Sequence, residues 1–156
     1  MARELEGVPI VLVGIHPLLI GSLLAALDGM GHGDVLVVAD ANFPARRGPA
    51  PVVDIPTASA PRLVTAVRTV FPLDPEEPLS FMTCPDGWVP VQRDLHDAAS
   101  EGGSGRVELL DRYAFYDLAA KAQLLIRTGE LRAYGNVALR KGVIPLPGGG
   151  GHGQDR

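Results

Sequence analysis

The feature that most constrains the fold is an apolar helical pattern that leads, through one short turn, into a buried strand. Between residues 17 and 30 apolar side chains recur at helical spacing, and Gly31 stands where a glycine commonly ends a helix. Residues 35–39 then form a continuous apolar run bounded by turn residues, which is typical of a strand buried in a parallel sheet. This succession predicts an α/β domain.

Helices and strands are predicted to alternate along the rest of the chain. Helices are expected from Ser59 onward, over 91–100 and over 113–128, with strands over 79–83 and 107–110 and extended segments over 8–13, 134–139 and 142–144. The proline-rich stretch 41–58 is expected to be mostly loop, with residues 52 and 53 extended. We therefore predict one domain over 1–146, with a mostly parallel sheet flanked by helices, and a disordered glycine-rich tail over 147–156.

Composition excludes several classes of function. The 156 residues are 46% apolar and 21% charged, as in globular proteins, and the net charge of −4 argues against nucleic acid or a membrane as partner. Prolines and polar residues interrupt the longest apolar region, and no cleavage signal follows the N-terminus, so we expect a cytoplasmic location. Cys84 is the only cysteine, which removes cysteine zinc sites and internal disulfides. We expect no cofactor and no metal.

His32 is the first candidate for a catalytic group. Glycines on both sides expose its ring, and the carbonyl end of the preceding helix favours the imidazolium form by about 0.3–1 kcal/mol. A histidine that is partly protonated near neutrality can act as a general acid. The alternative is an ordinary surface or core histidine, which most lone histidines are.

Three further positions carry groups that could bind a polar ligand. Asp40 ends the apolar strand, where ligands of parallel sheets bind, or else it caps the turn that follows. Arg112 opens a helix, where a cation is unfavourable, so it points either at a ligand or into solvent. Tyr134 and Asn136 flank Gly135 and would share one face of a strand; the alternative is an edge turn.

Seven motifs, in this order, make the chain similar to one known family. They are GIHPLL (14–19), MGHGD (30–34), ADANFPA (39–45), FPLD (71–74), RYAFY (112–116), RTGE (127–130) and YGN (134–136). Over most of its length the chain resembles the fucose mutarotase / ribose pyranase family. The resemblance implies an enzyme that interconverts sugar anomers without a cofactor, with His32 as catalytic acid and a sugar held by Asp40, Arg112, Tyr134, Gly135 and Asn136.

Details of the motifs resemble the fucose branch of that family. The pyranase branch usually has histidine in place of Arg112 and alanine in place of Gly135. Tyr113 and Leu118 depart from the fucose pattern, and residues 85–105 match poorly. The sequence therefore predicts a mutarotase for L-fucose, with D-ribose pyranase activity or a non-catalytic sugar-binding module as the alternatives.

Anomer interconversion needs an acid at the ring oxygen and a base at the anomeric hydroxyl, and Tyr134 is the best candidate to act with His32. A strand over 35–39 would be about 16 Å long at ~3.3 Å per residue. His32 and Asp40 lie beyond its opposite ends, so one chain would struggle to present both to one sugar. We therefore predict a homo-oligomer with pockets shared between adjacent subunits, and the resemblance implies rings such as decamers.

Overall fold

The computed structural model describes residues 9–101, 103 and 105–148. In chain order its elements are α1 (Gly21–Asp28), β1 (Val35–Ala39), β2 (Val52–Ile55), α2 (Ala60–Arg68), β3 (Leu79–Met82), α3 (Pro90–Ser100), β4 (Val107–Leu110), α4 (Arg112–Ala120), β5 (Leu124–Thr128) and β6 (Val137–Arg140). All but two residues of the tail that we expected to be disordered lie outside the described residues. No helix in the described ranges has the length and apolar character needed to cross a membrane.

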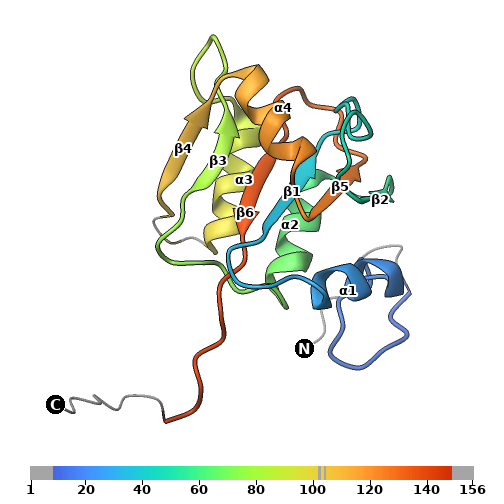
Figure 1. Cartoon of the computed structure of the whole chain (residues 1–156). Coiled ribbons are helices and arrows are strands. Elements are labelled where there is room, and N and C mark those ends of the chain that lie inside the picture. The colour runs from blue at the N-terminus through green and yellow to red at the C-terminus, as the bar shows by residue number, and fades with distance from the viewer. Residues whose placement is uncertain (1–8, 102, 104, 149–156) are drawn as a thin grey trace, which may run out of the picture.

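The strands form one sheet in the order β2-β5-β1-β6-β3-β4. β5 is parallel to both β1 and β2, and β3 is parallel to β4. β6 is antiparallel to β1 and to β3, so the other five strands share one direction (Figure 1). The mostly parallel sheet expected from the sequence is confirmed.

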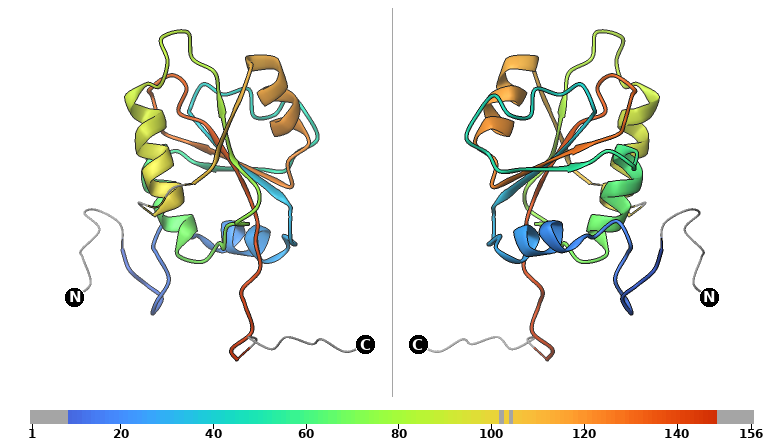
Figure 2. Two further views of the ribbon diagram at one scale, coloured as in Figure 1. Left: turned by 90° about the vertical axis from the view of Figure 1, so that its left-hand side faces the viewer. Right: turned by 90° about the vertical axis from the view of Figure 1, so that its right-hand side faces the viewer.

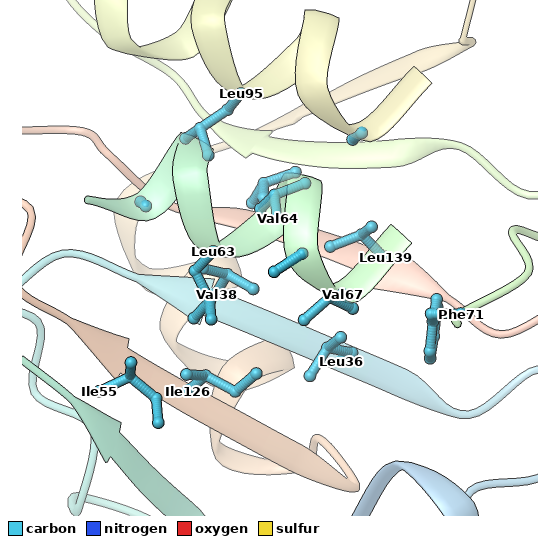
Figure 3. Packing of buried hydrophobic residues seen from close by; sticks show 14 of the residues in the cluster. Leu36, Val38, Ile55, Leu63, Val64, Val67, Phe71, Leu95, Ile126 and Leu139 are labelled. Atoms are coloured by element: carbon cyan, nitrogen blue, oxygen red, sulfur yellow. The ribbon is translucent and has the colours of Figure 1, made fainter. Parts of the chain in front are cut away.

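Helices cover both faces of this sheet. Residues of α1, α2 and α3 share one apolar cluster with one face, and α4 packs in a second cluster on the other face, so that the domain has three layers (Figure 2). In the first cluster, Leu63, Val64 and Val67 of α2 lie over Leu36 and Val38 of β1 (Figure 3).

Burial on both faces explains the continuous apolar run of β1. Leu36 and Val38 belong to the cluster beneath α2, whereas Val37 and Ala39 belong to the cluster beneath α4. Because side chains alternate between the faces of a strand, a strand between two helical layers must be apolar at every position. The sequence therefore placed β1 correctly at 35–39.

The helix expected over 113–128 is wrong in its second half. α4 ends at Ala120, and residues 124–128 form β5, which pairs with both β1 and β2. Leu125 does pack in the same cluster as Phe115, as the helical pattern required, but it does so from the sheet. A short apolar run that is buried on both faces has no periodicity of its own, so it extended the pattern of the preceding helix.

Smaller expectations also fail. Tyr134 has φ = +65°, in the left-handed region, and β6 begins only at Val137, so the segment with Gly135 and Asn136 is a turn rather than a strand. Residues 9–13 and 142–144 form no strand, and the extended conformation expected there stays a prediction. α1 begins at Gly21 rather than at residue 17. The cap of α2 is as expected, since the Ser59 hydroxyl oxygen accepts a hydrogen bond from the Arg62 N–H at 3.4 Å.

Candidate functional site

A pocket of about 270 Å³ opens at the edge of the sheet where the parallel strands end. Asp40 directly follows β1, Met82 ends β3, and Arg112 begins α4 just after β4. Tyr134 and Asn136 come from the turn before β6, whose first residues lie at this edge because β6 runs opposite to its neighbours. Ligands of open α/β sheets bind at this edge.

Asp40 is held firmly at the floor of the pocket. Its backbone N–H donates to Oδ1 of Asn136 at 2.8 Å, and its own Oδ1 accepts from the Asn42 N–H at 3.0 Å. Burial raises the pKa of the Asp40 carboxyl above its usual value, although hydrogen bonds from Asn42 and Asn136 oppose the rise. Asp40 thus caps the turn and also lines the pocket, so the two interpretations of this residue are compatible.

Arg112 and Tyr134 complete the polar lining. Asp111 caps α4 by accepting from the Ala114 N–H at 2.9 Å, so the helix start does not need Arg112. Arg112 lines the same pocket as Asp40 and is exposed. Tyr134 lines the pocket from its left-handed backbone conformation, which is uncommon for a residue with a side chain.

Gly135 is buried and does not line the pocket. A Cβ at this position would stand 2.8 Å from Cγ of Glu130 and 3.1 Å from the carbonyl oxygen of Arg132, so a side chain would force the turn apart. The close packing of Gly135 lets its two neighbours present their side chains to the pocket. Direct contact of Gly135 with a sugar stays a prediction.

Glu130 anchors this turn, and sequence reasoning assigned it no role. Its side chain is only 5% exposed and accepts hydrogen bonds from the Ala60 N–H, from the Arg132 N–H at 3.1 Å and from Nε of Arg132 at 2.9 Å. Burial alone would raise the pKa of Glu130, but the hydrogen bonds and the charge of Arg132 outweigh burial and lower it. Asp94 of α3 holds the far side of Arg132 at 2.9 Å. In the sequence, the RTGE motif (127–130) was the signal that could have drawn attention to Glu130.

His32 lies away from this pocket. It stands in the turn between α1 and β1, at the opposite end of β1 from Asp40, and its side chain is 63% exposed. Its Nε2 atom is 2.8 Å from Oδ2 of Asp74, a second residue that sequence reasoning left without a role. A hydrogen bond from the Glu76 N–H, followed by the one from His32, lowers the pKa of Asp74 against the opposing effect of burial. The FPLD motif was the signal for this residue.

The pocket can therefore hold a small polyhydroxylated molecule. It offers a carboxylate, a guanidinium, an amide and a phenol, with Phe43 and Tyr116 as apolar walls. Among the described residues, no three His, Cys, Asp or Glu side chains form a group that could hold a metal ion. Fold and pocket together define a small-molecule-binding protein of the α/β class.

Residues 13–144 match the RbsD / FucU transport protein family, and the chain belongs to that family. It is 37% identical over 143 residues to the L-fucose mutarotase of Actinobacillus pleuropneumoniae, covering 87% of this chain and 99% of that protein.

Solved structures with bound sugars resemble the chain as well. The fucose mutarotase of Streptococcus pneumoniae in complex with L-fucose has a TM-score of 0.78 and 28% identity, and the match covers 86% of this chain and all of that one. RbsD of Bacillus subtilis complexed with D-ribose has a TM-score of 0.66 and 25% identity, with 81% and 95% covered.

Proposed function

We propose that this protein is a sugar mutarotase that interconverts the α and β anomers of L-fucose. The polar pocket supports this proposal, as do the relatives named L-fucose mutarotase and the related structure that contains L-fucose. Arg112 and Gly135 favour L-fucose over D-ribose, because both match the fucose branch of the motifs. The presence of D-ribose in a related structure keeps pyranase activity as the second candidate.

The reaction opens the pyranose ring and closes it on the other face of C1. His32 protonates the ring oxygen, while the Tyr134 hydroxyl takes the proton of the anomeric hydroxyl and passes its own proton to water. Asp40, Arg112 and Asn136 bind sugar hydroxyls and fix the orientation of the ring. Each positioned acid or base typically contributes about 10²–10⁴-fold, which is sufficient for a reaction that already proceeds in water.

The position of His32 carries the most specific part of the proposal. The sugar-binding candidates meet at one end of β1, and His32 lies at the other, about 16 Å away along the strand. We infer that each pocket is completed by His32 of a second copy. The protein is then a homo-oligomer with active sites between adjacent subunits, for which a ring such as a decamer is one arrangement.

Two inactive variants test this arrangement when they are mixed. His32→Ala lacks the acid but keeps the pocket, whereas Asp40→Ala lacks a pocket residue but keeps the acid. If sites are shared, random reassembly after mild dissociation joins an intact pocket to an intact His32 in about one quarter of sites. NMR saturation transfer between the L-fucose anomers measures the recovered rate.

The outcomes distinguish the alternatives. Recovery toward a quarter of the wild-type rate supports shared sites, and a mixture as inactive as its components contradicts them. A wild-type protein that binds L-fucose without accelerating exchange is a sugar-binding module rather than an enzyme. Faster pyranose–furanose exchange on D-ribose than anomer exchange on L-fucose would favour the pyranase.

A further inference from the structure

We propose that a second pocket, between α4 and the loop that follows β1, binds a neutral monosaccharide. This pocket (the Arg47 pocket) has a volume of about 290 Å³, close to that of the pocket that contains Asp40 (the Asp40 pocket). The two pockets share the side chains of Phe43, Pro44 and Tyr116 as a common wall. The proposal concerns binding alone, so it does not depend on the mutarotase reaction in the Asp40 pocket.

One wall of the Arg47 pocket is a single stripe of α4. Four of its residues there follow the i, i+3, i+4, i+7 pattern that places side chains on one face of a helix. They are Tyr113, Tyr116, Asp117 and Ala120. The helix therefore presents two phenols and a carboxylate to the same space. Tyr113 is also one of the positions at which the chain departs from the fucose pattern.

The opposite wall is a loop that is fixed against α4. Gly48 packs so closely on the end of the helix that a Cβ there would stand 2.5 Å from Cβ of Ala120. The buried ring of Phe43 meets the Tyr116 ring edge-on, with the ring centroids 5.4 Å apart. Cζ of Arg47 lies over the Tyr116 ring, 5.5 Å from its centroid. Contacts along the whole loop therefore hold the two walls in one arrangement.

Two opposite charges line this pocket without pairing. Arg47 and Asp117 are both exposed, and neither takes part in an ion pair within the described part of the chain. An anion would be attracted by Arg47 but repelled by Asp117, and a cation would meet the reverse. A hydroxyl group suits both, because it donates to a carboxylate and accepts from a guanidinium. The charges therefore favour a neutral ligand with several hydroxyls over an ion of either sign.

The rest of the lining is apolar and suits the faces of a sugar ring. Phe43 and Tyr116 supply aromatic rings, and four aliphatic side chains add methyl groups. These are Ala45, Ala119, Ala120 and Leu125. A pyranose carries C–H groups on its faces and hydroxyls around its edge, so it can contact both kinds of lining at once. A neutral monosaccharide therefore matches the pocket in size, charge and apolar surface.

Methyl NMR can follow the two pockets separately while L-fucose is titrated into the wild-type protein. Ala119 and Ala120 line the Arg47 pocket and not the Asp40 pocket, whereas Leu131 and Ala133 line the Asp40 pocket and not the Arg47 pocket. We expect both groups of methyl signals to shift, each with its own dissociation constant. Ala119 and Ala120 signals that stay fixed throughout the titration would overturn the proposal.

Asp117→Asn and Arg112→Met distinguish direct binding from an effect transmitted through the shared wall. Both residues are exposed, and each lines one of the two pockets but not the other. We expect Asp117→Asn to raise the dissociation constant reported by the Ala119 methyl about tenfold and to leave that of Leu131 unchanged, because a hydrogen bond to a charged group typically contributes that much. Arg112→Met should do the reverse. If the Ala119 signal follows the Arg112 substitution instead, there is one site and the proposal is wrong.

Asp97→Asn is the matched control, since it removes the same charge from a side chain that is 79% exposed on α3, across the sheet from α4. It should leave both dissociation constants unchanged. A loss equal to that in Asp117→Asn would mean that net charge alone is responsible, which contradicts the proposal.

Arg47→Met gives a second, independent test of the pocket. It keeps an unbranched stem beside Tyr116 but removes the guanidinium donors, and it should also raise the dissociation constant reported by Ala119 about tenfold. An unchanged constant would contradict the proposal. If the Ala119 signal responds to L-fucose and the Leu131 signal does not, the second pocket is supported and the proposed function of the first is refuted.

Discussion

Replacing Glu130 with alanine should destabilise the turn that lines one side of the pocket. Glu130 makes no contact with the pocket space, yet it joins the start of α2 to the turn that carries Tyr134 and Asn136. The change removes every acceptor that this carboxylate supplies, so its cost can be worked out from the groups that lose a partner.

The largest cost comes from Ala60, which is fully buried. Without the carboxylate its N–H has no acceptor, and a buried N–H left in this state costs about 1–3 kcal/mol. The backbone N–H of Arg132 loses a partly buried hydrogen bond to Glu130, which adds about 1 kcal/mol to the cost. The Arg132 side chain is 47% exposed and keeps its ion pair with Asp94, so water and Asp94 largely replace the lost contact with Glu130. We expect Glu130→Ala to lower the free energy of unfolding by about 3 kcal/mol, near the lower end for a broken buried ion pair.

Urea denaturation at pH 7 measures this loss, with Asp94→Asn as the matched control. That variant removes the other carboxylate of Arg132, which is 52% exposed, and should cost less than about 1 kcal/mol. In the folded fraction of Glu130→Ala, the KM for L-fucose should rise about fivefold or more, equivalent to about 1 kcal/mol of binding free energy. Equal costs for the two variants would refute the reasoning, and so would an unchanged KM.

The pH dependence gives an independent test of Glu130. Its pKa is lowered in the folded state, so its stabilising contribution is present above the unfolded value of about 4.3 and is lost as pH falls through the folded value. Glu130→Ala should remove this part of the acid dependence of unfolding. A variant whose stability falls with acid as steeply as that of the wild type would contradict the assignment.

Two further results are expected. Because burial raises the pKa of Asp40, its carboxylate becomes protonated at a pH above the usual value of about 3.9. The KM for L-fucose should therefore rise as pH falls through that region. A KM that stays constant while the fold is intact would argue against Asp40 as a sugar ligand. Gly129→Ala should lower the free energy of unfolding, measured by urea denaturation, by about 1–3 kcal/mol, because the new Cβ would collide with the Pro56 carbonyl oxygen. Gly21→Ala is the control and should leave the free energy of unfolding unchanged, since no atom lies within 4 Å of its Cβ position. Similar values for the two variants would refute the steric argument.

Local patterns in the sequence were enough for many of the elements. The continuous apolar run gave β1, Ser59 gave the start of α2, and the glycine-flanked His32 was recognised as an exposed ring. These features depend on residues within one or two turns of each other, and their physical causes are burial, capping and backbone freedom. The motifs also indicated Asp40, Arg112, Tyr134 and Asn136, and the fold brings all four to one pocket.

The sequence alone, then, determined the class of fold, the positions of most strands and helices and four polar residues that line the pocket. Only the tertiary structure decided that 124–128 is a strand, that Asn136 holds Asp40 from 96 residues away, and that Asp74 lies against His32. The physical reason is the order of the sheet. β5 and β6 flank β1 although both come late in the chain, and no local pattern of residues encodes which strands become neighbours.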